Sequence, residues 1–175
     1  MAVHEHKEEA PELVRCDVIT VSDSRTLETD KSGKLMLSLL EEEGLKVLDR
    51  TIVPDEMEKI QRSVQQSLEN EMVDVVLLNG GTGISERDVT IEAVQPLIHK
   101  EIPGFGELFR YLSYSEDIGS AALMSRALAG TKAGKAIFCT PGSSGAVRLA
   151  MTRLILPELR HIKRELWKDR HVDER

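Results

Sequence analysis

The sequence lacks any apolar run long enough to cross a membrane, since no stretch approaches the ~18 apolar residues that a spanning helix needs. Residues 1–12, MAVHEHKEEAPE, are polar and acidic, without the apolar core of a secretory signal. Basic residues are outnumbered, because 23 Lys and Arg face 30 Asp and Glu, for a net charge of −7. Nucleic-acid surfaces need clustered Lys and Arg. We therefore expect a cytoplasmic protein with neither nucleic acid nor membrane as a partner.

Cysteine and the common catalytic motifs are scarce as well. Cys16 and Cys139 lie in predicted strands without CxxC or Cys/His spacing, so we expect buried small hydrophobes rather than metal ligands or a disulfide. The five histidines are scattered, and we expect none to be catalytic. No GxxxxGK[ST], GxGxxG after the first strand, or GxSxG is present, which excludes a P-loop NTPase, an ordinary dinucleotide-binding protein and a hydrolase elbow.

What the sequence does contain is an alternation of β-branched apolar runs with segments of helical spacing. Strands are predicted at 16–21, 45–53, 74–79 and 135–140, and helices at 30–44, 55–69, 90–99, 105–114, 120–130 and 141–166. Pro157 is expected to kink the last helix. This order predicts an α/β domain with a mostly parallel sheet. The domain is expected over 14–167, between a flexible N-terminal arm (1–13) and a polar C-terminal tail (168–175). The stretch 100–130 has no predicted strand and is expected to cover one side of the sheet.

A loop rich in Gly, Ser, Thr or Asp follows each predicted strand. These loops are 22–33 (SDSRTLETDKSG), 54–56 (PDE), 80–88 (GGTGISERD) and 141–145 (PGSSG). In a parallel sheet they meet at one edge, where ligands bind. The glycines of 80–83 allow positive φ and close backbone approach, so their N–H groups can point at an anion. Residues 31–33 and 142–145 open helices, whose N-terminal N–H groups also favour phosphate or carboxylate.

Two aspartates in these loops suggest that the site also holds a metal ion. A carboxylate beside a phosphate is repulsive unless a cation lies between them, so Asp55 and Asp88 are candidate Mg²⁺ ligands. The alternative is that each only caps the helix that follows, just as Ser22-Asp23 could only form a turn. Arg87 could offset charge on the same loop or could pair with its neighbours.

Six motifs occur in an order that matches a known family. They are VITVSDSRTLETDKSG (18–33), VPDE (53–56), GGTGISERDVT (80–90), IPGFGELFRYLS (102–113), MSRALAG (124–130) and PGSSGAVRLA (141–150). From about residue 14 to residue 166 the chain resembles the MoaB/MogA family of molybdenum-cofactor biosynthesis proteins, and also the G domain of gephyrin. The motifs ETDKSG and IPGFGELFR resemble the MoaB branch. Asn79 departs from the family pattern, which has Thr or Ser before GGTG, and we expect little consequence.

The resemblance implies a three-layer α/β/α domain that binds molybdopterin. Active members transfer AMP from Mg-ATP to the terminal phosphate of molybdopterin and release pyrophosphate, ahead of molybdate or tungstate insertion. By position in the motifs, the molybdopterin-binding residues would be Gly80, Gly81, Thr82, Gly83, Pro141, Gly142, Ser143 and Ser144. The nucleotide-binding residues would be Ser22, Asp23, Ser32 and Gly33. Asp55 and Asp88 would be catalytic and would hold Mg²⁺.

The resemblance also implies a homo-oligomer, a trimer or a hexamer, and other cofactor-biosynthesis proteins as partners. Exposed apolar residues within 102–114 could serve a subunit contact. The alternative function is a non-catalytic molybdopterin-binding or carrier protein, which would need the glycine loops but neither the aspartates nor Mg-ATP.

Overall fold

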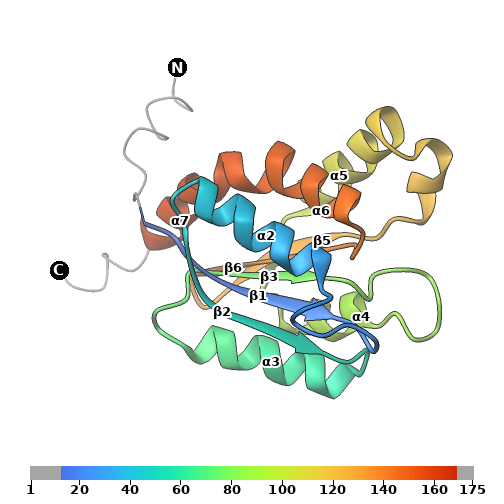
Figure 1. Ribbon diagram of the computed structural model, residues 1–175. Coiled ribbons are helices and arrows are strands. Elements are labelled where there is room, and N and C mark those ends of the chain that lie inside the picture. The colour runs from blue at the N-terminus through green and yellow to red at the C-terminus, as the bar shows by residue number, and fades with distance from the viewer. Residues whose placement is uncertain (1–12, 169–175) are drawn as a thin grey trace.

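A six-stranded sheet forms the middle layer of the molecule (Figure 1). The computed structural model describes residues 13–168, so the predicted arm and tail lie outside the described residues except at their inner ends. The strands are β1 (Arg15–Val21), β2 (Lys46–Val53), β3 (Val75–Asn79), β4 (Lys100–Glu101), β5 (Leu128–Lys132) and β6 (Lys135–Thr140). Their order in the sheet is β2-β1-β3-β6-β5-β4. The strands β1, β2, β3 and β6 are parallel, which confirms the predicted mostly parallel α/β sheet.

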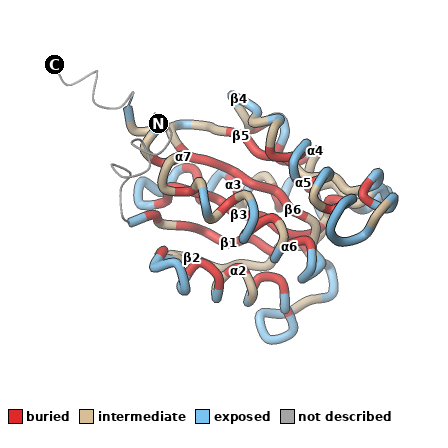
Figure 2. Tube along the Cα trace, turned by 90° about the horizontal axis from the view of Figure 1, so that it is seen from above, coloured by how far each residue is buried: buried red, intermediate tan, exposed pale blue. Residues whose placement is uncertain are grey.

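Helices cover both faces of this sheet. They are α2 (Lys31–Glu42), α3 (Met57–Glu69), α4 (Thr90–Val94), η1 (Gln95–Leu97), α5 (Pro103–Glu116), η2 (Gly119–Met124), α6 (Ser144–Ala150), the π-helical η3 (Met151–Ile155) and α7 (Leu156–Lys168). One face packs against α2, α5, α6 and α7, and the other against α3 and α4 (Figure 1). The strands β3 and β6 are buried along their whole length, as Figure 2 shows. The three-layer arrangement is therefore confirmed.

The helix predicted at 120–130 is wrong. Its first half forms the short η2, and its second half forms β5, which pairs antiparallel with β6. Ala133 and Gly134 connect these two strands with φ of 51° and 70°, the two positive values that a type I′ hairpin turn requires. Alanine and leucine favour a helix locally, but pairing with the edge of the sheet overrides that preference. The stretch 100–130 thus contributes β4 and β5 to the sheet.

The C-terminal helix predicted from 141 with a kink at Pro157 begins at Ser144 and contains a π-helical segment just before that proline. A π-helical turn, η3, lies directly before Leu156-Pro157. Proline has no N–H, and its ring would clash with the carbonyl of residue 153 in a regular helix, so the wider turn accommodates it. No helix between residues 13 and 168 is long and apolar enough to span a bilayer.

Candidate ligand-binding site at the strand ends

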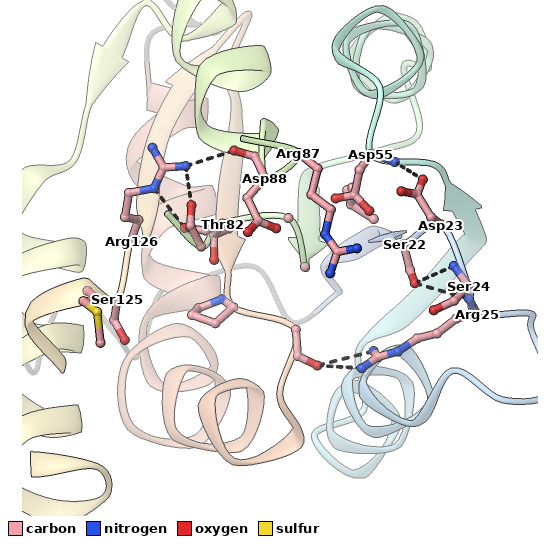
Figure 3. A pocket seen from close by; sticks show the side chains of 17 residues that line it. Ser22, Asp23, Ser24, Arg25, Asp55, Thr82, Arg87, Asp88, Ser125 and Arg126 are labelled. Carbon is pink, nitrogen blue, oxygen red and sulfur yellow. Dashed lines mark hydrogen bonds between the residues drawn. The ribbon is translucent and has the colours of Figure 1, made fainter. Parts of the chain in front are cut away.

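One open pocket lies at the carboxyl ends of the four parallel strands, where the loops after β1, β2, β3 and β6 meet (Figure 3). Its volume is about 430 Å³. It is lined by residues 21–25, 55, 80–83, 87–88, 124–126 and 141–142. The structure therefore brings together all four loops that the sequence placed at this edge. The segment 124–126, directly before β5, is an additional contributor that the sequence analysis did not include.

The backbone of the GGTG loop, residues 80–83, turns its carbonyl groups toward the protein. Thr90 binds the first two carbonyl oxygens, through its hydroxyl at 2.8 Å and its amide at 2.9 Å. Arg126 binds the other two, through Nε at 2.9 Å and Nη2 at 2.8 Å. The amides of residues 81–83 donate no hydrogen bond within the described part of the chain. A loop with occupied carbonyls and unoccupied amides at a pocket wall is suited to hold an anion.

Glycine is required at this loop by both conformation and space. Gly80 and Gly81 have φ of 97° and 64°, a region that other residues rarely adopt. A Cβ on Gly81 would lie 2.3 Å from Thr90 Oγ1, and a Cβ on Gly142 would lie 3.0 Å from the Gly80 Cα. The loops after β3 and β6 thus approach each other more closely than side chains would allow.

Three carboxylates, those of Asp23, Asp55 and Asp88, face this pocket (Figure 3). Burial raises the pKa of the Asp55 carboxyl, and the negative charges of Asp23 and Asp88 raise it further. The Asp55 amide donates to Asp23 Oδ1 at 2.9 Å, which fixes the loop after β2 against the loop after β1. The side wall of the pocket therefore carries negative charge that is not fully neutralised.

Asp55 and Asp88 do not act as helix caps. The N-cap residues of α3 and α4 are Glu56 and Val89, and neither makes a side-chain capping bond. The capping alternative is therefore wrong for both aspartates. No group of three or more Asp, Glu, His or Cys side chains within residues 13–168 is arranged to hold a metal ion. A cation here would take protein ligands from one or two carboxylates and the rest from water or a bound phosphate, as Mg²⁺ usually does.

Arginines supply the positive charge of the pocket. Arg25 donates to Ser32 Oγ at 2.5 Å and to the carbonyl of Gly142 at 3.3 Å, so it joins the loops after β1 and β6. Arg87 points into the pocket in Figure 3 and makes no hydrogen bond or ion pair within the described residues. Sequence analysis had assigned no role to Arg25. The signal was present in its position within the SDSR segment, but the partners of a long side chain depend on the tertiary fold.

Ser32 and Gly33, which the resemblance assigned to the nucleotide, lie outside the pocket lining. Asp30 caps α2 by accepting the Gly33 amide at 2.9 Å, and both Asp30 and Ser32 are fully buried. The N-terminus of α2 is therefore occupied by the chain's own carboxylate and is not open to an external anion. Ser32 also donates to Asn79 Oδ1 at 2.7 Å and accepts from Arg25, so the buried Ser32 hydroxyl fixes the position of the Arg25 side chain.

The other assigned residues divide between the pocket and its surroundings. Pro141 and Gly142 line the pocket together with Ser22 and Asp23. Ser143 caps α6 by accepting the Ala146 amide at 3.2 Å. Ser143 and Ser144 are exposed and lie outside the lining. The predicted buried state of both cysteines is confirmed, and burial raises the pKa of the Cys16 thiol to about 12.

Comparison with known proteins defines the class of domain that carries this pocket. Residues 17–161 match the family described as "Probable molybdopterin binding domain". Molybdenum cofactor biosynthesis protein B of Bacillus subtilis (strain 168) is 64% identical over 170 residues, which are 97% of this chain and 100% of that protein. The counterpart in Staphylococcus carnosus is 55% identical, covering 89% and 92% of the two chains.

Solved structures give the same result. A crystal structure of molybdenum cofactor biosynthesis protein B is 61% identical with a TM-score of 0.89, over 91% of this chain and 99% of that one. The tungsten cofactor synthesizing protein MoaB from Pyrococcus furiosus is 36% identical with a TM-score of 0.79, over 90% and 99%. The chain therefore belongs to the MoaB family of cofactor biosynthesis proteins.

Proposed function

We propose that this protein binds molybdopterin and transfers AMP from Mg-ATP to its terminal phosphate. An oxygen of that phosphate attacks the α-phosphorus of ATP, the bond from the α-phosphorus to the α,β-bridging oxygen breaks, and pyrophosphate leaves with the electron pair. The attacking oxygen is already anionic near neutral pH, so no general base is needed. The protein then contributes positioning and charge neutralisation.

The observation that supports this proposal most strongly is the GGTG loop. Its carbonyl oxygens are bound by Thr90 and Arg126, while the amides of residues 81–83 have no acceptor among the described residues. These amides would hold the molybdopterin phosphate, and Arg87 would contact a phosphate of either substrate. Ser22 and Asp23, which also line the pocket, would lie beside the nucleotide.

The carboxylates of the pocket fit a magnesium ion. Asp55 has a raised pKa because of burial and because Asp23 and Asp88 lie close to it, which is the condition that a bound cation relieves. Asp55 and Asp88 would hold Mg²⁺. When bound with ATP, this ion would neutralise charge on the phosphate chain and on the departing pyrophosphate.

The proposal is tested by measuring pyrophosphate release and molybdopterin binding with Asp88→Ala. Transfer should fall by orders of magnitude while binding of molybdopterin survives. Asp49→Asn, an exposed carboxylate on β2 away from the pocket, is the matched control and should behave as the unmodified protein. Normal transfer by Asp88→Ala, or loss of molybdopterin binding together with transfer, would contradict the assignment of Asp88. A protein that binds molybdopterin but releases no pyrophosphate would instead be a carrier or binding module.

We also propose that the protein is a homo-oligomer. Tyr111, Tyr114 and Leu123 of α5 and η2 are 65%, 63% and 90% exposed, although large apolar side chains are usually covered. The same region carries Leu108 and Met124, which are also more than half exposed. Leu123→Asp should lower the mass of the assembly in light scattering. An unchanged trimer or hexamer would remove this surface from the interface.

A further inference from the structure

Arg126 forms hydrogen bonds with three carbonyl groups of the pocket wall and with the Glu92 carboxylate. Its Nε donates to the Thr82 carbonyl at 2.9 Å, and its Nη2 donates to the carbonyls of Gly83 at 2.8 Å and Asp88 at 3.2 Å. The Glu92 carboxylate on α4 also accepts hydrogen bonds from this guanidinium, one from Nη1 and one from Nη2 at 3.2 Å. One guanidinium thus contacts both ends of the loop 82–88 (Figure 3) and, through Glu92, the helix α4 that follows it.

This arrangement leaves Arg126 poorly suited to bind a ligand itself. Its Nε and both Nη atoms are engaged with protein acceptors. Its charge is matched by Glu92, whose pKa is lowered by the hydrogen bond from Arg126. Arg87 differs in both respects, since it points into the same pocket and forms no hydrogen bond or ion pair with a described residue. The two arginines of this wall therefore have different tasks.

We infer that Arg126 is a positioning residue for the transfer reaction, and this inference rests on the proposed function. By holding the carbonyls of residues 82 and 83 away from the pocket, it keeps the amides of the loop available to a phosphate. By holding the carbonyl of Asp88, it fixes the backbone from which that carboxylate projects. Without it, these peptide groups can rotate and present carbonyl oxygens to the anion, which is repulsive.

A lysine cannot replace this arginine. The contacts use Nε and Nη2, which lie on one edge of a rigid planar guanidinium and reach two separate carbonyls at once. A lysine carries its charge on a single atom at the end of a flexible chain. Arg126→Lys therefore preserves charge and removes the geometry, so it separates the two contributions.

The test compares Arg126→Lys and Arg126→Ala with Arg153→Lys and Arg153→Ala as matched controls. Arg153 pairs with Glu116 on the surface and lies outside the pocket. Four quantities are measured for each protein: the unfolding midpoint, the Kd for molybdopterin, and kcat and KM for ATP. Because the loss of a residue that orients binding groups, or a displacement of those groups by about 1 Å, commonly changes activity by about 10- to 100-fold, we expect kcat of Arg126→Lys to fall by that factor. Its Kd for molybdopterin should rise about tenfold, and KM for ATP should change less than about threefold.

Chemical rescue distinguishes positioning from a general loss of structure. Millimolar guanidinium should restore part of kcat and part of molybdopterin affinity to Arg126→Ala, and should leave Arg153→Ala unchanged. The inference is overturned if Arg126→Lys keeps normal affinity and kcat, or if Arg126→Ala loses activity only in proportion to unfolding and is not rescued. If the unmodified protein releases no pyrophosphate, the proposed function fails. The role of Arg126 is then decided by two measurements: the Kd of its variants for molybdopterin, and the recovery of that affinity by guanidinium in Arg126→Ala.

Discussion

Replacing Gly81 by alanine is the perturbation with the clearest physical consequence. Gly81 has φ of 64°, and an added Cβ would lie 2.3 Å from Thr90 Oγ1 and 2.8 Å from Asp55 Oδ1. The positive φ alone costs a residue with a Cβ about 1–2 kcal/mol. Overpacking adds about 1–3 kcal/mol, and displacement of the Thr90 hydroxyl from the buried Gly80 carbonyl adds about 1–3 kcal/mol.

Gly44 provides a matched control for the same substitution. It has a φ of 70° at the end of α2, and nothing lies within 4 Å of an added Cβ. Gly44→Ala should therefore cost only the conformational part. The two variants should differ by about 2–6 kcal/mol, which is roughly 4–24 °C in Tm for a chain of this size. Because assembly makes Tm concentration-dependent, both are heated at equal chain concentration.

Ligand binding completes the comparison. Gly81→Ala should also lose affinity for molybdopterin at least tenfold, whereas Gly44→Ala should bind as the unmodified protein does. If the two variants unfold within about 1 °C of each other and bind equally, the loop is not the tight phosphate-binding element described above.

Three further substitutions test the charges of the molecule. Burial raises the pKa of Asp17, so the folded protein favours the protonated carboxyl and the free energy of unfolding falls as pH rises through that pKa. Asp17→Asn stays neutral at every pH. In urea unfolding it should therefore be more stable than the unmodified protein by about 1 kcal/mol at pH 7, but not below pH ~4. Asp23→Asn should lower the pKa of Asp55 by removing a neighbouring negative charge, and should shift the acid limb of the pH–activity profile to lower pH. Arg87→Ala should weaken molybdopterin or ATP binding by about 10- to 150-fold, since a charged hydrogen bond contributes about 1.5–3 kcal/mol. It should not lower Tm, because Arg87 is exposed; unchanged affinity would exclude Arg87 from the phosphate contacts.

The parallel core and the meeting of the loops were predictable because both follow from local patterns. Apolar runs such as DVVLLN at 74–79 form strands, and parallel strands place their following loops at one edge by geometry alone. The glycine content of GGTG indicates backbone freedom without any knowledge of neighbours. These features needed no long-range contact to be identified.

The parts that sequence did not predict depend on contacts between distant residues. The segment 120–130 contains Ala, Leu and Met residues that favour a helix, whereas the strand β5, in which this segment ends, is fixed by its pairing with β6. Arg126 lies directly before β5, so the error in that element also concealed its position beside the loop 82–88. Similarly, the capping of α2 by Asp30 closes a helix end that looks open in the sequence. Only Gly134 indicated a turn between β5 and β6, because alanine is not a usual residue at the first position of a type I′ turn.

The central claim is that the pocket transfers AMP to molybdopterin, and the mass of the product tests it most directly. Molybdopterin incubated with the protein and Mg-ATP should gain one AMP, detected by mass spectrometry with equimolar release of pyrophosphate. The reaction should require Mg²⁺ and should be lost in Asp88→Ala. Molybdopterin that binds tightly but returns with unchanged mass, under conditions where ATP and Mg²⁺ are saturating, would contradict the account.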